Sequence, residues 1–231
     1  APDCVAHDMA PPTSQHRTRG WHLRRYTRCI ERARQARDAV CGGDRMDAVV
    51  MCGGRGSRLS CRTEKPLVEV GGRPMLSNVV RACEAGEIDQ VHAATSRHTP
   101  ATREWACDHQ IDVIDTPGAG YVEDLAVVMM QLEPPFLTVT ADIPGVAPRH
   151  IERVLCSHRT SRQAVTAVTS AYVKRWLGCS VAPQYRAADF IPVGLNIVGP
   201  DPEEVVAMFD PAVSVNVNTR TDLQIARTRC A

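Results

Sequence analysis

MDAVVMCGGRGSRLSCRTEKPL, at residues 46–67, is the stretch of this chain that predicts its fold. An apolar run at residues 48–52 ends in three glycines within four positions, Gly53, Gly54 and Gly56. An apolar run bounded by glycines is typical of a buried strand that enters a loop. Because glycine has no Cβ, the backbone of this loop can adopt positive φ and approach a ligand closely. We therefore expect a buried strand followed by a ligand-binding loop.

The charges beside this loop indicate the class of ligand. Backbone N–H groups freed by the glycines, together with Arg58 and Lys65, suit a polyanion such as a triphosphate. Two well-known phosphate loops do not match, because no Gly-Lys pair completes a P-loop and Leu59 stands where a dinucleotide fingerprint needs its third glycine. The remaining pattern, G-G-x-G-[ST]-R followed by Lys-Pro, indicates a nucleotide-binding loop. The alternative interpretation is a plain glycine-rich turn beside a chance lysine.

Composition limits the classes of protein that fit. The 231 residues are enough for one domain, or for one domain with an appendage. A formal net charge of +1 does not indicate a nucleic-acid or membrane partner, and the sequence shows no apolar run of transmembrane length and no secretory signal. The ten cysteines form no C-x-x-C pair. We therefore expect reduced thiols in a cytoplasmic protein, rather than disulfides, zinc or an iron–sulfur cluster.

Residues 1–45 differ from the rest of the chain in charge. They hold nine arginines, no lysine and five acidic residues, which gives a net charge of +4. We expect a poorly ordered basic extension over residues 1–45 and a single domain over residues 46–231, with Met46 as a candidate natural start. A basic arm that binds nucleic acid is the alternative interpretation of this segment.

Apolar periodicity and turn residues predict an alternation of strands and helices along the domain. The predicted strands cover residues 48–52, 67–70, 88–94, 111–114, 136–140, 164–169, 190–198 and 213–217. The predicted helices cover residues 74–84, 99–109, 121–132, 148–158, 202–208 and 221–227. Strands that alternate with helices of this length form right-handed βαβ units. The sequence therefore predicts an α/β fold, a Rossmann-like three-layer sandwich with a mostly parallel sheet.

The position of the ligand site follows from this fold class. In parallel α/β sheets, ligands bind outside the carboxyl ends of the strands. Four features each follow a predicted strand: the glycine loop, Thr95 with Ser96, the turn that contains Gly118 and Gly120, and Asp142. We expect these features to converge on one edge of the sheet.

The charged and amide side chains predict the chemistry of that edge. Asp142 suits a Mg²⁺ ion held against triphosphate oxygens, although it could instead form an Asx turn after its strand. Lys65 is a compact charge suited to the α-phosphate, and Arg58 can form bidentate bonds to pyrophosphate oxygens. Asn216 and Asn218 lie on one side of a predicted strand, because side chains alternate there. They could contact the metal, its bound water or a residue that holds the metal, or they could simply form hydrogen bonds at the end of the strand.

The order of these motifs resembles a known family. MDAVVMCGGRGSRL…EKPL, AATS, IDTPGAGYVEDL, a strand that ends at Asp142, IPVGLNIV and VNVNT-x-x-DL are similar to those of the archaeal adenosylcobinamide-phosphate guanylyltransferases (CobY type), within the MobA-like nucleotidyltransferase superfamily. The resemblance extends from about Met46 to Ile225. Cys52 stands where alanine is usual, and the segment from Arg58 to Lys65 is slightly long.

This resemblance implies a nucleotide-diphospho-sugar transferase-like fold and a reaction in cobalamin assembly. GMP passes from GTP to adenosylcobinamide phosphate, pyrophosphate leaves, and Mg²⁺ is the cofactor. The partners are GTP and a corrinoid phosphate, with no nucleic acid and no membrane, and a homodimer is compatible with the chain. The alternatives are another MobA-like enzyme that acts on molybdopterin or a sugar phosphate, and a non-catalytic regulatory domain that binds GTP.

The residue roles that we expect combine the motifs with the resemblance. The expected catalytic residues are Arg58, Lys65 and Asp142, and the expected metal ligands are Asp142 and Asn218. The expected nucleotide contacts are Cys52, Gly53, Gly54, Arg55, Gly56, Ser57, Thr95, Ser96, Gly118 and Gly120. The expected acceptor contacts are Gly194 and Asn196.

Overall fold

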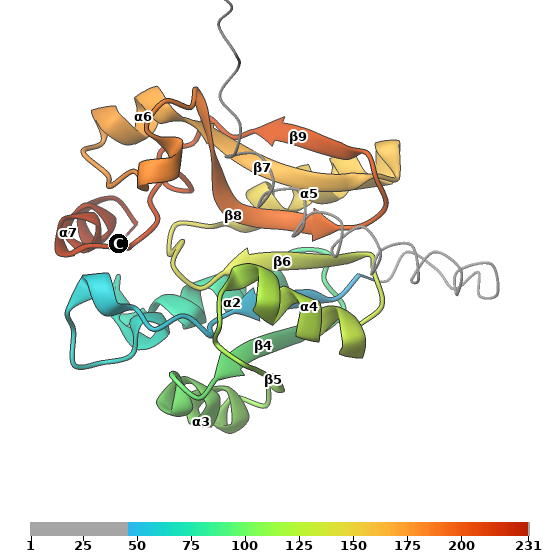
Figure 1. Ribbon diagram of the computed structural model, residues 1–231, viewed down its shortest axis with the longest axis horizontal. Coiled ribbons are helices and arrows are strands. Elements are labelled where there is room, and N and C mark those ends of the chain that lie inside the picture. Colours follow the sequence, from blue (N-terminus) through green and yellow to red (C-terminus); the bar gives the residue numbers. More distant parts are fainter. Residues whose placement is uncertain (1–45, 231) are drawn as a thin grey trace, which may run out of the picture.

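The computed structural model describes residues 46–230, so the predicted extension at residues 1–45 lies outside the described residues. Seven strands form one sheet in the spatial order β5 (Asp112–Thr116), β4 (Val91–Ser96), β1 (Ala48–Met51), β6 (Phe136–Thr140), β8 (Phe190–Val198), β7 (Ala164–Ser170) and β9 (Glu203–Ala207), as Figure 1 shows. Only β8 runs antiparallel to its two neighbours, β6 and β7. The sheet is therefore mostly parallel.

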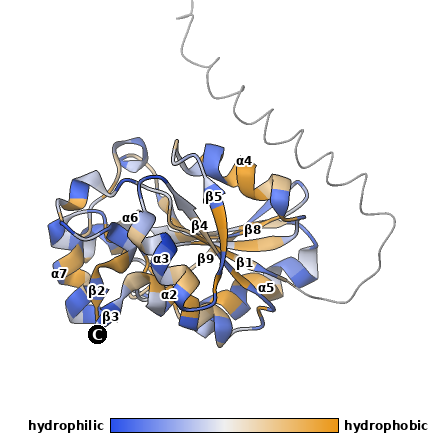
Figure 2. Ribbon diagram, turned by 90° about the horizontal axis from the view of Figure 1, so that it is seen from below, coloured by the Kyte–Doolittle hydropathy of each residue, from blue (hydrophilic) through white to orange (hydrophobic). Residues whose placement is uncertain are grey.

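Helices cover both faces of this sheet. Helices α2 (Met75–Glu84), α3 (Pro100–Asp108) and α5 (Pro148–Ser161) pack on one face, and α4 (Tyr121–Gln131) packs on the other (Figure 2). Val50 of β1 belongs to the core under α2 and α5, whereas its neighbour Val49 belongs to the core under α4. Side chains of a strand alternate between faces, so a strand covered on both sides needs apolar residues at every position. This is why β1 reads as a continuous apolar run.

The predicted fold class is confirmed. The strands β6 and β8 have the predicted bounds, and the helices expected near residues 74–84, 99–109, 121–132, 148–158 and 221–227 begin and end within three residues of them. The last of these helices is α7 (Arg220–Arg229). The chain of βα units places the glycine loop and Asp142 after β1 and β6, which are adjacent in the sheet. The two most informative motifs therefore meet at one edge.

The predicted helix at residues 202–208 is wrong. Residues Glu203–Ala207 form β9, which pairs parallel with β7. Val206 is buried and Val205 is exposed, an alternation with the period of a strand. Two adjacent β-branched valines favour the extended conformation as well, and pairing with β7 supplies their backbone hydrogen bonds.

The predicted strand at residues 213–217 is also wrong. This segment contains a turn and then irregular backbone, and Val217 N–H donates to the Asp142 carbonyl oxygen at 2.8 Å. The neighbouring strand β6 is already paired with β1 on one side and β8 on the other, so it has no free edge for another strand. The two asparagines of this segment nevertheless lie beside Asp142, as described below.

Three smaller differences bear on the site. Helix α6 (Ala171–Trp176) was not predicted from the sequence. The strand expected at residues 67–70 is a short 3₁₀ turn, Lys65–Leu67, followed by β2 (Glu69–Val70), which pairs with β3 (Arg73–Pro74). Strands β4 and β5 extend further than expected, so Thr95 and Ser96 lie within a strand rather than after one. Across the described residues, none of the helices has the length and apolar character needed to cross a membrane.

Candidate active site

A cleft of about 330 Å³ opens at the carboxyl ends of β1 and β6. Its lining contains residues from the glycine loop and from four other parts of the chain: Cys52, Gly53, Gly54, Arg58, Lys65, Gly120, Tyr121, Asp124, Asp142 and Asn218 are among them. Ligands of parallel α/β sheets bind at this end of the strands. The cleft thus lies where the sequence predicts the ligand site.

The glycine loop approaches its surroundings too closely for side chains at two of its positions. Gly56 has φ +60°, and a Cβ there would lie 2.8 Å from Cβ of Lys65. A Cβ on Gly53 would lie 2.8 Å from Oδ2 of Asp124. Gly54, in contrast, faces open space. The loop therefore needs glycine at Gly53 and Gly56 for its own packing, and it exposes backbone to the cleft at Gly54.

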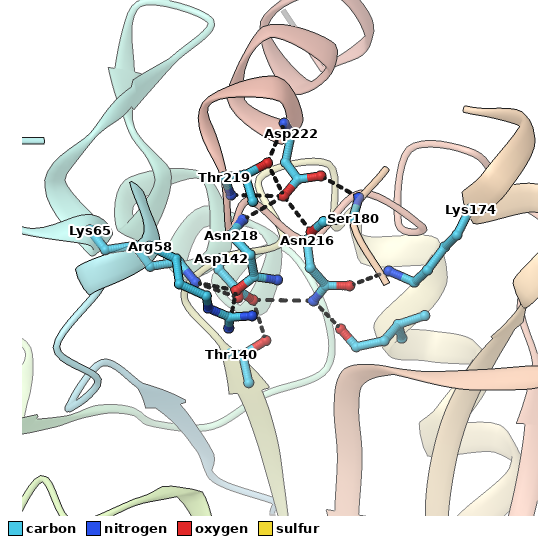
Figure 3. Close-up of polar contacts among 11 residues, drawn as sticks. Arg58, Lys65, Thr140, Asp142, Lys174, Ser180, Asn216, Asn218, Thr219 and Asp222 are labelled. Carbon is cyan, nitrogen blue, oxygen red and sulfur yellow. Dashed lines mark hydrogen bonds and ion pairs between the residues drawn. The ribbon is translucent and has the colours of Figure 1, made fainter. Parts of the chain in front are cut away.

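The central contact of the cleft is an ion pair between Lys65 and Asp142. The Lys65 ammonium donates to Oδ2 of Asp142 at 2.7 Å and to Oδ1 of Asn218 at 3.0 Å. Arg58 also donates to Oδ1 of Asn218, at 3.2 Å (Figure 3). All four residues predicted for catalysis or metal binding therefore contact one another in this cleft.

The carboxylate of Asp142 is held in its charged form. Burial by itself raises the pKa of Asp142, but the Lys65 ammonium and the hydrogen bonds to the carboxylate together outweigh it and lower the pKa below its usual value. Hydrogen bonds to Oδ1 act in the same direction, from the Thr140 hydroxyl at 2.8 Å and from Nδ2 of Asn216 at 3.2 Å. Asp142 is thus an anionic oxygen donor at neutral pH.

Asn218 is held in place by a buried carboxylate at the start of α7. Asp222 is fully buried, and its Oδ2 accepts from the backbone N–H groups of Asn218 at 3.0 Å and Thr219 at 2.8 Å. The Thr219 hydroxyl and the N–H and hydroxyl of Ser180 also donate to Asp222. Burial raises the pKa of Asp222, and these hydrogen bonds outweigh it and lower the pKa. The capping box of α7 therefore also fixes the backbone that carries Asn218.

Lys65 is held by the residue before it. The Glu64 carboxylate accepts from the backbone N–H groups of Ala101 at 2.8 Å and Thr102 at 2.7 Å, and from the Thr102 hydroxyl at 2.6 Å. These groups belong to the first turn of α3, and the N-cap residue Thr99 makes no side-chain cap of its own. A carboxylate at a helix N-terminus satisfies unpaired N–H groups and complements the helix dipole. Glu64 thereby attaches the loop that carries Lys65 to the body of the fold.

The donor set of the cleft fits Mg²⁺. Asp142 supplies a carboxylate and Asn218 supplies an amide oxygen, and Mg²⁺ in nucleotide enzymes is held by one or two such oxygens together with substrate phosphates. Within residues 46–230 there is no cluster of three His, Cys, Asp or Glu side chains that could hold a metal without a substrate. The residues present therefore suit a metal that arrives with a nucleotide.

The other predicted nucleotide contacts lie in or behind the glycine loop. Ser57 opens a short 3₁₀ turn after the loop, and Arg55 is exposed and donates to Nε2 of His98. Cys52 is buried, and burial strongly raises the pKa of its thiol. Thr95 is also buried, while the Ser96 hydroxyl donates to the Gly53 carbonyl oxygen at 2.8 Å. Ser96 of β4 thus holds the backbone of the glycine loop at Gly53.

The turn before α4 and the strand β8 hold the remaining predicted residues. Gly118 and Gly120 have φ of +66° and +142°, and Gly120 lines the cleft. Gly194 packs against the Thr140 side chain, and a Cβ at this position would collide with Oγ1 of Thr140. Nδ2 of Asn196 donates to the hydroxyl of Tyr121, a residue of the cleft lining, at 3.2 Å. The two predicted acceptor residues therefore contact Thr140 and Tyr121, which both line the cleft.

Three functional candidates were not found by sequence reasoning. Asp124 is a buried carboxylate of the cleft lining, and its Oδ1 accepts from Gly118 N–H at 2.8 Å. In the sequence, a carboxylate in the first turn of a helix is an ordinary feature and does not by itself indicate a ligand site. Glu64 was visible as part of the EKP motif but had no assigned partner. Lys174 of α6 is buried beside Asn216, and no local pattern indicates it.

Comparison with known proteins identifies the family. The MobA-like NTP transferase domain matches residues 48–190 of this chain. The chain belongs to the MobA-like NTP transferase family. It is similar to the adenosylcobinamide-phosphate guanylyltransferase of Methanocaldococcus jannaschii, with 30% identity over 189 residues that cover 78% of this chain and 95% of that protein. The bifunctional protein GlmU of Alkalilimnicola ehrlichii is 29% identical over 113 residues, 48% of this chain and 24% of GlmU. As a MobA-like protein with these relatives, the chain is a nucleotidyltransferase.

Solved structures share the fold at low sequence identity. A CMP:2-keto-3-deoxy-manno-octonic acid synthetase complexed with CTP has a TM-score of 0.58 and 18% identity, covering 80% of this chain and 98% of that one. A putative glucose-1-phosphate thymidylyltransferase from Bacillus anthracis has a TM-score of 0.61 and 15% identity, covering 80% and 95%. The nucleotide-diphospho-sugar transferase-like fold is thereby confirmed for this MobA-like chain.

The contacts of Glu64 lead to a prediction about stability. Glu64→Ala removes the cap of α3, and loss of a cap costs about 1–2 kcal/mol, which is roughly 2–8 °C in Tm for a domain of this size. Glu64→Gln keeps one carbonyl acceptor, so its Tm should lie between the Tm of Glu64→Ala and that of the wild type. Thermal unfolding followed by circular dichroism measures both. Glu69→Ala, at an exposed position on β2, is the control, and an unchanged Tm for Glu64→Ala would contradict the capping role.

Proposed function

We propose that this MobA-like nucleotidyltransferase is a GTP:adenosylcobinamide-phosphate guanylyltransferase that uses Mg²⁺. The 30% identity to the guanylyltransferase of Methanocaldococcus jannaschii, over 95% of that protein, supports this acceptor and this nucleotide. The single structural observation that supports nucleotidyl transfer lies beside the glycine loop, where the Lys65 ammonium donates to both Asp142 and Asn218. This set provides cationic and metal-binding groups for a triphosphate.

The reaction joins two anions, so charge neutralisation and positioning supply most of the catalysis. An oxygen of the acceptor phosphate attacks the α-phosphorus of GTP, a new P–O bond forms, and the bond to the bridging oxygen of the β-phosphate breaks. Pyrophosphate leaves with that electron pair. Backbone groups of the glycine loop bind the triphosphate, Lys65 neutralises charge at the α-phosphate, and Arg58 binds the pyrophosphate oxygens. Asp142 and Asn218 would hold Mg²⁺, which would supply further positive charge to the phosphates.

Asp124 is suited to read guanine. The Watson–Crick edge of guanine presents the N1–H and N2–H₂ donors, which a buried carboxylate accepts, whereas adenine presents an acceptor at N1. Asp124 is 5% exposed and lies next to Gly53 in the cleft lining. Oδ1 of Asp124 already accepts from Gly118 N–H, and adenine N1 has no hydrogen to donate to Oδ2, so Asp124 disfavours ATP. The Asp124 carboxylate therefore favours GTP and disfavours ATP.

The base preference is tested by calorimetry with GTP and ATP. We expect GTP to bind much more tightly than ATP, and Asp124→Asn to weaken GTP binding by about 10- to 100-fold, since a hydrogen bond to a charged group contributes about 1.5–3 kcal/mol. Asp115→Asn, at an exposed carboxylate paired with Arg103, is the control. Equal affinities of the wild-type protein for GTP and ATP would contradict the guanylyl assignment and leave the fold unaffected.

Substitutions in the cleft separate chemistry from binding. Lys65→Ala should lower turnover by about 10²–10³-fold with a much smaller effect on GTP affinity, because charge builds up at the α-phosphorus in the transition state. Asp142→Asn should lower turnover and raise the Mg²⁺ concentration required. Gly56→Val should instead impair GTP binding, because its side chain would collide with Lys65 at a positive φ. Pyrophosphate release and calorimetry measure the two effects.

The control for these variants is Arg159→Ala, which removes an exposed cation of α5 that is paired with Glu87. Incubation with GTP, Mg²⁺ and separate acceptors distinguishes the rival functions. Pyrophosphate release with molybdopterin or a sugar phosphate alone would indicate another MobA-like enzyme, and GTP binding without release for any acceptor would indicate a regulatory domain. Near-normal turnover of both Lys65→Ala and Asp142→Asn would show that the site lies elsewhere.

A further inference from the structure

Lys174 is a buried cation without a carboxylate partner in direct contact. It lies on α6 and is 3% exposed. Its ammonium donates to the carbonyl oxygen of Ser214 at 2.8 Å and to Oδ1 of Asn216 at 2.7 Å (Figure 3). Within residues 46–230, none of the ion pairs formed by lysine and arginine involves this side chain. Its partners are both acceptors on the segment that leads to Asn218.

The contact with Lys174 determines which way the Asn216 amide points. An ammonium only donates, so the atom of Asn216 that faces Lys174 must be the amide oxygen. The amide nitrogen then faces the other way, and it donates to Oδ1 of Asp142 at 3.2 Å and to the carbonyl oxygen of Val193 at 2.9 Å. A reversed amide would direct its NH₂ group at the ammonium and its oxygen at two other acceptors. The amide therefore has one orientation in which every contact is favourable.

We propose that Lys174 is a positioning residue that acts through Asn216 to hold the Asp142 carboxylate in place. The proposal rests on the proposed function, because Asp142 is the carboxylate assigned there to the metal. Asp142 lies between two lysines in this arrangement. Lys65 contacts Oδ2 directly, whereas Lys174 reaches Oδ1 through one amide group. Lys174 touches neither reacting atoms nor substrate.

Packing of α6 alone does not explain a lysine at this position. Burying a cation costs free energy unless polar partners compensate, and an apolar side chain would fill the same space without that cost. Burial lowers the pKa of Lys174, and the nearby Cys179, Asp142 and Asp222 oppose this shift. The Lys174 nitrogen donates to two acceptors of one segment, so it orders the segment that carries Asn216. Residues that orient the ligands of a metal or a catalytic centre act in this way.

The first experiment observes the amide without any substrate. In the full-length protein, NMR measures exchange of the Asn216 side-chain amide protons with solvent. Lys174→Met keeps the length of the side chain and removes the charge and the donors. We expect this variant to exchange the Asn216 amide protons at least about tenfold faster, because removal of an orienting contact typically costs about 10- to 100-fold in metal affinity or activity. Arg175→Met is the matched control, because this neighbouring cation of α6 is exposed and donates to the Arg186 carbonyl oxygen. Exchange at the wild-type rate in Lys174→Met would overturn the proposal.

The second experiment measures coupling between the two residues. We expect Lys174→Met and Asn216→Ala each to lower kcat by about 10- to 100-fold and to raise the Mg²⁺ concentration needed, with little change in KM for GTP. The double variant should be no slower than Asn216→Ala alone, because Lys174 acts through the amide that is already absent. Its Tm should exceed that of Asn216→Ala, since the double variant no longer leaves a buried ammonium without one of its two acceptors.

Two results would overturn the proposal. One is an additive loss of kcat in the double variant, and the other is a fall in Tm for Lys174→Met with kcat unchanged below that temperature. Lys174→Gln keeps a donor for Oδ1 of Asn216. If kcat of Lys174→Gln is closer to the wild-type value than kcat of Lys174→Met, the positioning role is supported even where Lys174→Met folds poorly. A wild-type protein that transfers no GMP would refute the proposed function alone, because the NMR measurement does not depend on transfer.

Discussion

The ion pair between Lys65 and Asp142 joins the two parts of the chain on which the site depends. Lys65 lies in the loop after β1, and Asp142 follows β6, 77 residues further along the chain. At 2.7 Å and 17% exposure for both side chains, this pair is partly desolvated. A lone charge left in such a place after loss of its partner costs about 3–5 kcal/mol when fully buried, and less here. The pair therefore holds both side chains in place before a nucleotide binds.

The residues around this pair show how the fold maintains it. Glu64 anchors the loop of Lys65 to the first turn of α3, and Asp222 anchors the backbone of Asn218 at the start of α7. Each anchor is a carboxylate that accepts from backbone N–H groups at a helix N-terminus, where the helix dipole favours negative charge. Asn218 accepts from Lys65, and so it would share its oxygen with a metal and with the lysine. The site is thus assembled from helix termini and loops over a rigid sheet.

The extent to which the sequence predicts this protein differs between its parts. The glycine loop, β6 and Asp142 were predictable because each depends on a local pattern, an apolar run followed by glycine or by a carboxylate. Residues 202–208 and 213–217 were assigned wrongly because the pairing of strands decides their structure, and β7 offers a free edge whereas β6 does not. Lys174 could not be predicted, since its partner Asn216 is 42 residues away and comes from an irregular segment. Local sequence thus identifies the cations and carboxylates, and tertiary contacts decide which of them meet.

A crystal structure of the protein with Mg²⁺ and a non-hydrolysable GTP analogue would test the roles of Lys65 and Asp142. We expect the triphosphate to lie along the glycine loop, the metal to contact Asp142 and Asn218, and the Lys65 ammonium to have moved from Oδ2 of Asp142 to a phosphate oxygen. A complex in which Lys65 and Asp142 remain paired, with the phosphates bound away from both, would contradict these roles.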